Sequence, residues 1–169
     1  MRIPLTGRVV VAALLLASIS LVHAPVRAGP IHEAAKAGDA VQVEALITAG
    51  AAVDEKDIAH KAPLHWAADA GHIDVVRLLI AKGANLDAKD VTDVTPLHLA
   101  VLGQHEPILE LLIAKGADVD SLDADRITAL DDATRRRYAG VVEILKRAGA
   151  QCGTNDHYSR DCKLAGGSE

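Results

Sequence analysis

The sequence predicts an all-α solenoid of four stacked helix-turn-helix repeats with loop or hairpin fingers, and three observations support this fold class. A fixed period of 33 residues runs through residues 29–150. Half of the chain is apolar, yet it contains no Phe, one Trp and two Tyr, and a core of Ala, Val, Leu and Ile suits closely packed helices. Charged residues of both signs make up 24%, which argues against intrinsic disorder.

The period is visible in five columns of identical residues, and such self-similarity is typical of repeat architectures. The columns contain Pro30, Pro63 and Pro96; Gly50, Gly83, Gly116 and Gly149; Ala34, Ala67, Ala100 and Ala133; Leu46, Leu79, Leu112 and Leu145; and Asp54, Asp87 and Asp120. The repeats fall at about residues 29–61, 62–94, 95–127 and 128–150. A helix pair this short cannot bury its own apolar face, so neighbouring repeats must stack.

The third repeat illustrates the expected helices. Thr95 is a favourable N-cap, and Pro96 suits the first helical position, where its missing N–H is not needed. These signals predict a first helix over 96–102 and a second over 106–115. Gly116 then supplies a left-handed C-terminal cap.

The repeat motifs point to a known family. The chain reads TPLHLA from Thr95 to Ala100, APLHWA from Ala62 to Ala67, and GHIDVVRLLIAKGANLDAKD from Gly71 to Asp90. These motifs resemble the ankyrin repeat, and the resemblance covers about residues 29–150. It implies a rigid scaffold that binds proteins and carries no catalytic chemistry of its own.

The sequence departs from the family pattern in two respects. The first and fourth repeats look like caps, because the first opens directly at Pro30 and the fourth carries polar residues suited to a solvent-facing end. The loop glycine usual in the family is replaced by His60, Asp93 and Arg126. This replacement argues against the family's tight finger turn, although aspartate tolerates a left-handed backbone better than most residues.

Residues 1–28 read as a signal peptide. Arg2 and Arg8 precede an apolar run over 9–22, and small residues lead to a cleavage site near Ala28. The apolar run is shorter than the roughly 20 residues needed to span a bilayer, although an uncleaved inner-membrane anchor remains an alternative. We therefore expect an exported bacterial protein, periplasmic or secreted, with no membrane contact in its mature form.

The charge balance restricts the class of partner. Removing residues 1–28, which hold three Arg and no acidic residue, changes the formal net charge from −5 to −8. Such a charge disfavours nucleic acid and anionic membranes, because phosphate binding needs clustered Lys and Arg. We expect a monomer that binds an unidentified protein partner.

Recurring histidines and aspartates are expected to be structural. His32, His65 and His98 share one column, and His72 and His105 share another. Such columns are spaced by one repeat, about 10 Å, which is too far for one metal ion with bonds of about 2 Å. Recurring aspartates, including Asp57, Asp90 and Asp123, are expected on exposed loops, in solvated turn-stabilising roles rather than in a catalytic pocket. With no nucleophile elbow or phosphate loop either, we expect no catalysis, metal or cofactor.

The two cysteines fall after the last repeat, in the tail over 151–169. Cys152 and Cys162 are expected to pair in a structural disulfide, because nearby cysteines usually pair in an oxidising compartment. A redox or metal-binding pair is the alternative, but its usual spacing is Cys-x-x-Cys.

The resemblance implies that a partner binds the concave face, formed by the fingers and the first helices. Mapped on this chain, the main candidates are Ile58, His60, Asp69, Val91, Asp93, Leu102, Asp125 and Arg126. Ile58, Val91 and Leu102 are apolar at positions expected to face solvent, as interface anchors do, and packing on an adjacent finger is the alternative. Trp66 aligns with Leu99 and is expected in the core rather than at a binding hot spot.

These features favour a protein-binding module that works by surface complementarity. Two related functions stay open: an inhibitor or immunity-type protein for a toxic partner, and an accessory factor in oxidative-stress defence.

Overall fold

The computed structural model describes residues 29–166, which form nine α-helices and no β-strand. The helices are α1 (Pro30–Ala37), α2 (Ala40–Thr48), α3 (Pro63–Ala70), α4 (Ile73–Ala81), α5 (Pro96–Leu102), α6 (Glu106–Ala114), α7 (Ala129–Arg136), α8 (Ala139–Arg147) and α9 (Arg160–Gly166). Within this range, no helix has the length and apolar character needed to cross a membrane. The predicted signal peptide lies outside the described residues.

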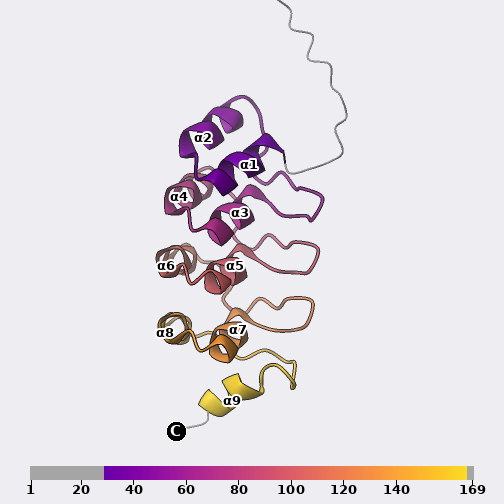
Figure 1. The fold of residues 1–169 in the computed structure, drawn as a ribbon, viewed down its shortest axis with the longest axis vertical. Helices are drawn as coiled ribbons and strands as arrows, with labels where there is room; N and C mark the ends of the chain where they lie inside the picture. Colours follow the sequence, from indigo (N-terminus) through magenta and orange to yellow (C-terminus); the bar gives the residue numbers. More distant parts are fainter. Residues whose placement is uncertain (1–28, 167–169) are drawn as a thin grey trace, which may run out of the picture.

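The helices stack in two parallel columns (Figure 1). The inner helices α1, α3, α5, α7 and α9 pack each on the next, and the outer helices α2, α4, α6 and α8 do the same. Three loops project beside the inner helices, away from the outer ones. We call them finger 1 (51–61), finger 2 (84–94) and finger 3 (117–127). The predicted helical solenoid is confirmed, and its fingers are loops rather than strand-bearing hairpins within residues 29–166.

Each of the first three inner helices begins at the expected proline and is capped by a histidine. The N-cap N–H groups of Gly29, Ala62 and Thr95 donate to the Nδ1 atom of the histidine three residues later, over 3.0, 3.1 and 3.3 Å. This bond is the backward half of a capping box, and it satisfies a backbone donor that the helix itself leaves unpaired.

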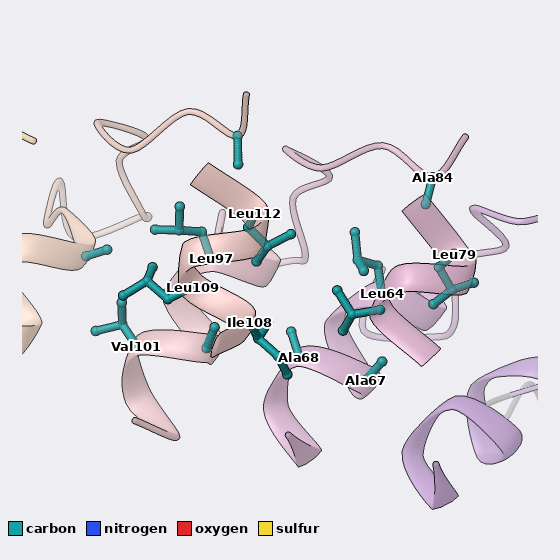
Figure 2. Packing of buried hydrophobic residues seen from close by; sticks show 14 of the residues in the cluster. Leu64, Ala67, Ala68, Leu79, Ala84, Leu97, Val101, Ile108, Leu109 and Leu112 are labelled. Atoms are coloured by element: carbon teal, nitrogen blue, oxygen red, sulfur yellow. The ribbon is translucent and has the colours of Figure 1, made fainter. Parts of the chain in front are cut away.

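The core lies between the two helix columns (Figure 2). Leu64 and Leu97 of the inner helices and Leu79 and Leu112 of the outer helices are all buried. Ala67, also buried, belongs to a column of alanines that allows the inner helices to approach closely. Small and aliphatic residues therefore fill the core without aromatic residues, as the composition predicts.

The N-terminal end of the stack is finished by a polar substitution. Gln42 is exposed on α2, whereas Val75, Ile108 and Val141 at the same repeat position are buried. The first repeat therefore presents a polar side chain where an internal repeat would need an apolar contact, as expected of a terminal cap.

The C-terminal end is longer than the sequence predicts. Residues after 150 form a further finger-like loop, and α9 packs on α7 as a further inner helix. The tail is thus half a repeat, and the fourth repeat is not the solvent-facing end. Its polar residues Asp131 and Asp132 are buried, and Asp131 accepts hydrogen bonds from Gly153 and Ser159 of the tail. The predicted disulfide between Cys152 and Cys162 closes this half repeat, with a Cα–Cα distance of 5.8 Å.

Candidate functional site

An aspartate near the start of each finger tip folds the loop back on itself. Asp57 Oδ1 accepts hydrogen bonds from the N–H groups of Ala59 (2.8 Å) and Lys61 (2.9 Å). Asp90 and Asp123 accept the same pair of bonds in fingers 2 and 3. The expected turn-stabilising role is confirmed, but the expected solvent exposure is wrong for Asp57 and Asp90, which are only 6% and 9% exposed, because each is enclosed by the turn that it stabilises.

The finger turn forms without the glycine of the family pattern. His60, Asp93 and Arg126 adopt positive φ angles of 56°, 59° and 61°. The expectation that these residues would prevent the tight turn is wrong, because the two aspartate-accepted bonds of each finger offset the cost of the left-handed backbone. All three side chains are exposed at the finger ends.

Neighbouring fingers are joined by hydrogen bonds along the stack. Val91 N–H donates to Ala59 O (3.0 Å), and Ala124 N–H donates to Thr92 O (2.9 Å). Lys56 Nζ donates to Lys89 O, one repeat further along the chain. At the finger bases Asp54, Asp87 and Asp120 each accept from a backbone N–H 31 residues later. The three fingers therefore form one connected array.

Histidines of two columns bond to the backbone of neighbouring segments. Within the first and second repeats, His32 and His65 donate through Nε2 to the carbonyl oxygens of Glu55 (2.7 Å) and Val94 (3.2 Å), which lie in fingers 1 and 2. In the second column, His72 and His105 donate to Lys36 O and Asp69 O at the ends of the preceding inner helices. Both columns are therefore structural, as predicted from the repeat spacing.

The apolar candidates differ in exposure. Ile58 and Val91, at the tips of fingers 1 and 2, are 68% and 60% exposed. They lie side by side, because Val91 N–H bonds to the carbonyl of Ala59, the residue after Ile58. Leu102 is half-buried at the end of α5, so the expectation that it faces solvent is only partly correct.

The polar candidates Asp69 and Asp93 lie on the same side of the stack as the finger tips with Ile58 and Val91. Asp69 is exposed on α3, at the repeat position that Leu102 occupies on α5. Asp93 is exposed at the end of finger 2, where its Oδ1 lies 3.8 Å from Lys89 Nζ.

The end of finger 3 contacts the tail. Arg126 Nε donates to Thr154 Oγ1 over 2.8 Å, and Asp125 is exposed beside Arg126. The candidate residues therefore share one surface, made of the fingers and the exposed side of the inner helices. We call this surface the finger–helix face.

Trp66 reaches this face and also packs against the core, so the expectation that it lies in the core is only partly correct. It is half-buried, and its Nε1–H donates to Asp57 Oδ2 over 3.0 Å. The ammonium nitrogens of Lys36 and Lys61 lie 5.0 and 5.1 Å from its ring centroid. The alignment with Leu99, which is buried, concealed this position, because indole is large and its N–H needs a polar partner.

The family comparison agrees with this architecture. A family model described as "Ankyrin repeats (many copies)" matches residues 64–113, which run from α3 to α6. Residues 64–113 are ankyrin repeats. None of the curated proteins compared with the chain matches it. Ankyrin repeats are typically non-catalytic modules for protein–protein interaction, so the finger–helix face is the candidate site.

Two sets of side chains that could do chemistry, the cysteine pair with Asp131 and the buried His65, are engaged in structure. Among the described residues, one group has metal-ligand spacing, namely Asp131, Cys152 and Cys162. Its two sulfurs are joined in the disulfide and are not available as thiolates. Burial lowers the pKa of His65 to about 4, and its two ring nitrogens are occupied by Ala62 N–H and Val94 O.

The hollows of the ankyrin stack that we identify lie away from this face. One shallow hollow of about 320 Å³ is formed between α6 and α8, where Ile113 and Ile144 are among its lining residues. A second lies between α4 and α6. Small-molecule sites usually enclose most of their ligand, which open hollows between outer helices do not do.

Proposed function

We propose that this chain is an exported, non-catalytic binding module that holds one protein partner on its finger–helix face. The observation that carries the proposal is the pair of exposed apolar tips, Ile58 and Val91, on fingers that are hydrogen-bonded to each other. Interface cores are built from apolar anchors within a polar rim. Here His60, Asp93 and Asp125 provide such a rim.

The connected fingers also favour binding. A loop that orders on binding loses conformational entropy, which subtracts from the affinity. Fingers that already bond to each other through backbone and lysine donors have less freedom to lose. The face therefore suits recognition by shape, with little rearrangement of the scaffold.

The test compares capture by three immobilised proteins from a periplasmic extract of the source organism. They are the native chain, the variant Ile58→Glu with Val91→Glu, and the control Val41→Glu. Val41 is 82% exposed on the outer helix α2, so the control places the same charge on an apolar site away from the face. We expect the control to capture the same partner as the native chain and the tip variant to lose it.

Circular dichroism and thermal melting should be unchanged in both variants, because all three side chains are largely exposed. A tip variant that is folded and still captures the partner would refute the finger–helix face as the binding site.

Export is tested separately on the protein recovered from the expressing cell. We expect the mature chain in the periplasm or the medium, with Gly29 as its first residue by mass spectrometry. A chain that keeps residues 1–28 and sediments with the membrane would instead support the anchor.

A further inference from the structure

The indole of Trp66 is fixed in place on the finger–helix face. Its N–H donates to Asp57 Oδ2 at 3.0 Å. The other oxygen of Asp57 accepts from Ala59 and Lys61, so the carboxylate is held by the finger turn itself. The ring therefore presents a constant surface between finger 1 and the inner helices.

Two ammonium groups lie against this ring without a carboxylate partner. Lys36 reaches it from α1 and Lys61 from the base of finger 1, at 5.0 and 5.1 Å from the centroid. Among the described residues, neither lysine takes part in an ion pair, whereas Lys82, Lys89 and Lys163 each do. Two like charges beside one ring repel each other, and an anion at this position would relieve that repulsion.

The fourth repeat shows a different arrangement of the same positions. Arg135 occupies the repeat position of Lys36, and it pairs with Asp132, three residues earlier on α7. Lys36 has Glu33 at the same spacing on α1, yet its ammonium lies over Trp66 instead. The cation of the fourth repeat is therefore neutralised within its own helix, and the cation at Trp66 is not.

We infer that Lys36, Trp66 and Lys61 form a subsite for carboxylate side chains, and that the partner presents an acidic segment with an apolar residue for Ile58 and Val91. This inference rests on the proposed function and specifies the partner of the same face. Lysine ammonium groups donate to carboxylates, and the indole supplies an apolar surface for the adjoining methylene groups. Exposed Asp69, Asp93 and Asp125 on the same face disfavour a polyanion such as nucleic acid.

The test uses Trp66 as its own reporter, since it is the only tryptophan of the chain. The native protein is titrated with three capped peptides that share a central leucine. The four positions around this leucine are all glutamate in the first peptide, all glutamine in the second and all lysine in the third. We expect a saturable change in tryptophan fluorescence with the glutamate peptide, confirmed by calorimetry. The dissociation constant of the glutamine peptide should be at least tenfold higher than that of the glutamate peptide. The dissociation constant of the glutamate peptide should increase with salt concentration.

Variants assign the binding to the subsite. We expect Lys36→Gln with Lys61→Gln to weaken binding of the glutamate peptide at least tenfold. The matched control, Arg77→Gln with Lys115→Gln on the outer side, should bind as the native chain does. The pair Lys36→Arg with Lys61→Arg should also retain binding, because a guanidinium keeps the positive charge, donates to carboxylates and stacks on an aromatic ring.

Three outcomes would overturn the inference: no saturable response to the glutamate peptide, equal binding of the glutamine or lysine peptide, or tighter binding of a single-stranded oligonucleotide. The capture experiment separates this failure from that of the proposed function. A partner that is lost by the tip variant and kept by Lys36→Gln with Lys61→Gln would leave the binding face standing and remove only its acidic specificity.

Discussion

Asp131 Oδ2 accepts a hydrogen bond from the backbone N–H of Gly153 at 2.8 Å, which attaches the tail to the fourth repeat. The same oxygen accepts from Thr128 N–H and from Ser159 Oγ–H, at 3.0 and 2.9 Å. In the repeat register, Asp131 stands where the other repeats carry His32, His65 and His98. A carboxylate thus caps its own helix, as those histidines do, and also holds the next segment of chain.

We expect Asp131→Ala to lower the free energy of unfolding by at least about 2 kcal/mol, because buried donors of Thr128, Gly153 and Ser159 lose their acceptor. Urea denaturation followed by circular dichroism measures the loss. The control is Asp69→Ala, which removes an exposed carboxylate from α3 and should change stability by less than about 0.5 kcal/mol. Equal effects of the two substitutions would contradict the role assigned to Asp131.

The disulfide between Cys152 and Cys162 should stabilise the half repeat at the C-terminal end. Closing a loop of this size contributes roughly 2–3 kcal/mol in the chain-entropy model. We expect Cys152→Ser with Cys162→Ser to lower the melting temperature and to speed amide hydrogen exchange in residues 151–166 more than in α3. A reductant should lower the melting temperature of the native chain and leave that of the double variant unchanged; an unchanged native chain would argue against the stabilising role.

Stability should decrease in mild acid because of His65. Burial lowers its folded-state pKa from 6.5 to about 4, with Lys56 and Lys61 acting in the same direction. Between pH 4 and 6.5 the imidazole of His65 binds a proton in the unfolded chain but not in the folded one. The contribution of neutral His65 to the free energy of unfolding is therefore complete above pH 6.5 and is lost as the pH falls towards 4. The full loss is roughly 3 kcal/mol, from about 1.4 kcal/mol per pKa unit.

The measurement is urea denaturation at several pH values between 7 and 4, for the native chain and for His65→Gln. The variant should show a shallower dependence, with a remaining slope to which His98 contributes, since burial lowers its pKa too. If the free energy of unfolding changed with pH in the same way in both proteins, His65 would not be the cause of the acid sensitivity between pH 4 and 6.5.

The left-handed finger ends carry a conformational cost that glycine would remove. His60 has φ 56°, and a left-handed backbone costs roughly 1–2 kcal/mol in a residue with a Cβ atom, partly offset by the greater entropy of unfolded glycine. We expect His60→Gly to raise the free energy of unfolding by up to about 1 kcal/mol and His60→Val to lower it. Equal stability of these two variants, measured by thermal melting, would contradict the strain.

The sequence predicts those parts of the fold that depend on local signals repeated in register. Pro96 and Gly116 mark the start and end of a helix pair by backbone chemistry alone, and the observed helices 96–102 and 106–114 agree with the predicted bounds to within one residue. The histidine column is predictable as a structural feature because each His accepts a hydrogen bond from the N–H three residues earlier, a geometry that the repeat fixes.

Three features could not be predicted, because they depend on contacts made only in three dimensions. Helix α9 begins at Arg160, 31 residues after the start of α7 at Ala129, so the half repeat of the tail does not follow the 33-residue period. The exposure of Trp66 depends on Asp57, a finger residue that holds the indole N–H at the surface. Asp57 itself read as a solvated loop carboxylate, because a turn that buries its own aspartate leaves no periodic signal.

The bonds that Asp54, Asp87 and Asp120 make along the finger bases have a consequence for the size of the molecule. Each bond joins a finger base to a backbone N–H 31 residues later, so the step is the same all along the stack. A copy of residues 62–94 inserted between the second and third repeats would meet the same donors and acceptors on both sides. The length of the stack, and with it the number of fingers, can therefore be changed by whole repeats while both terminal segments keep their sequences.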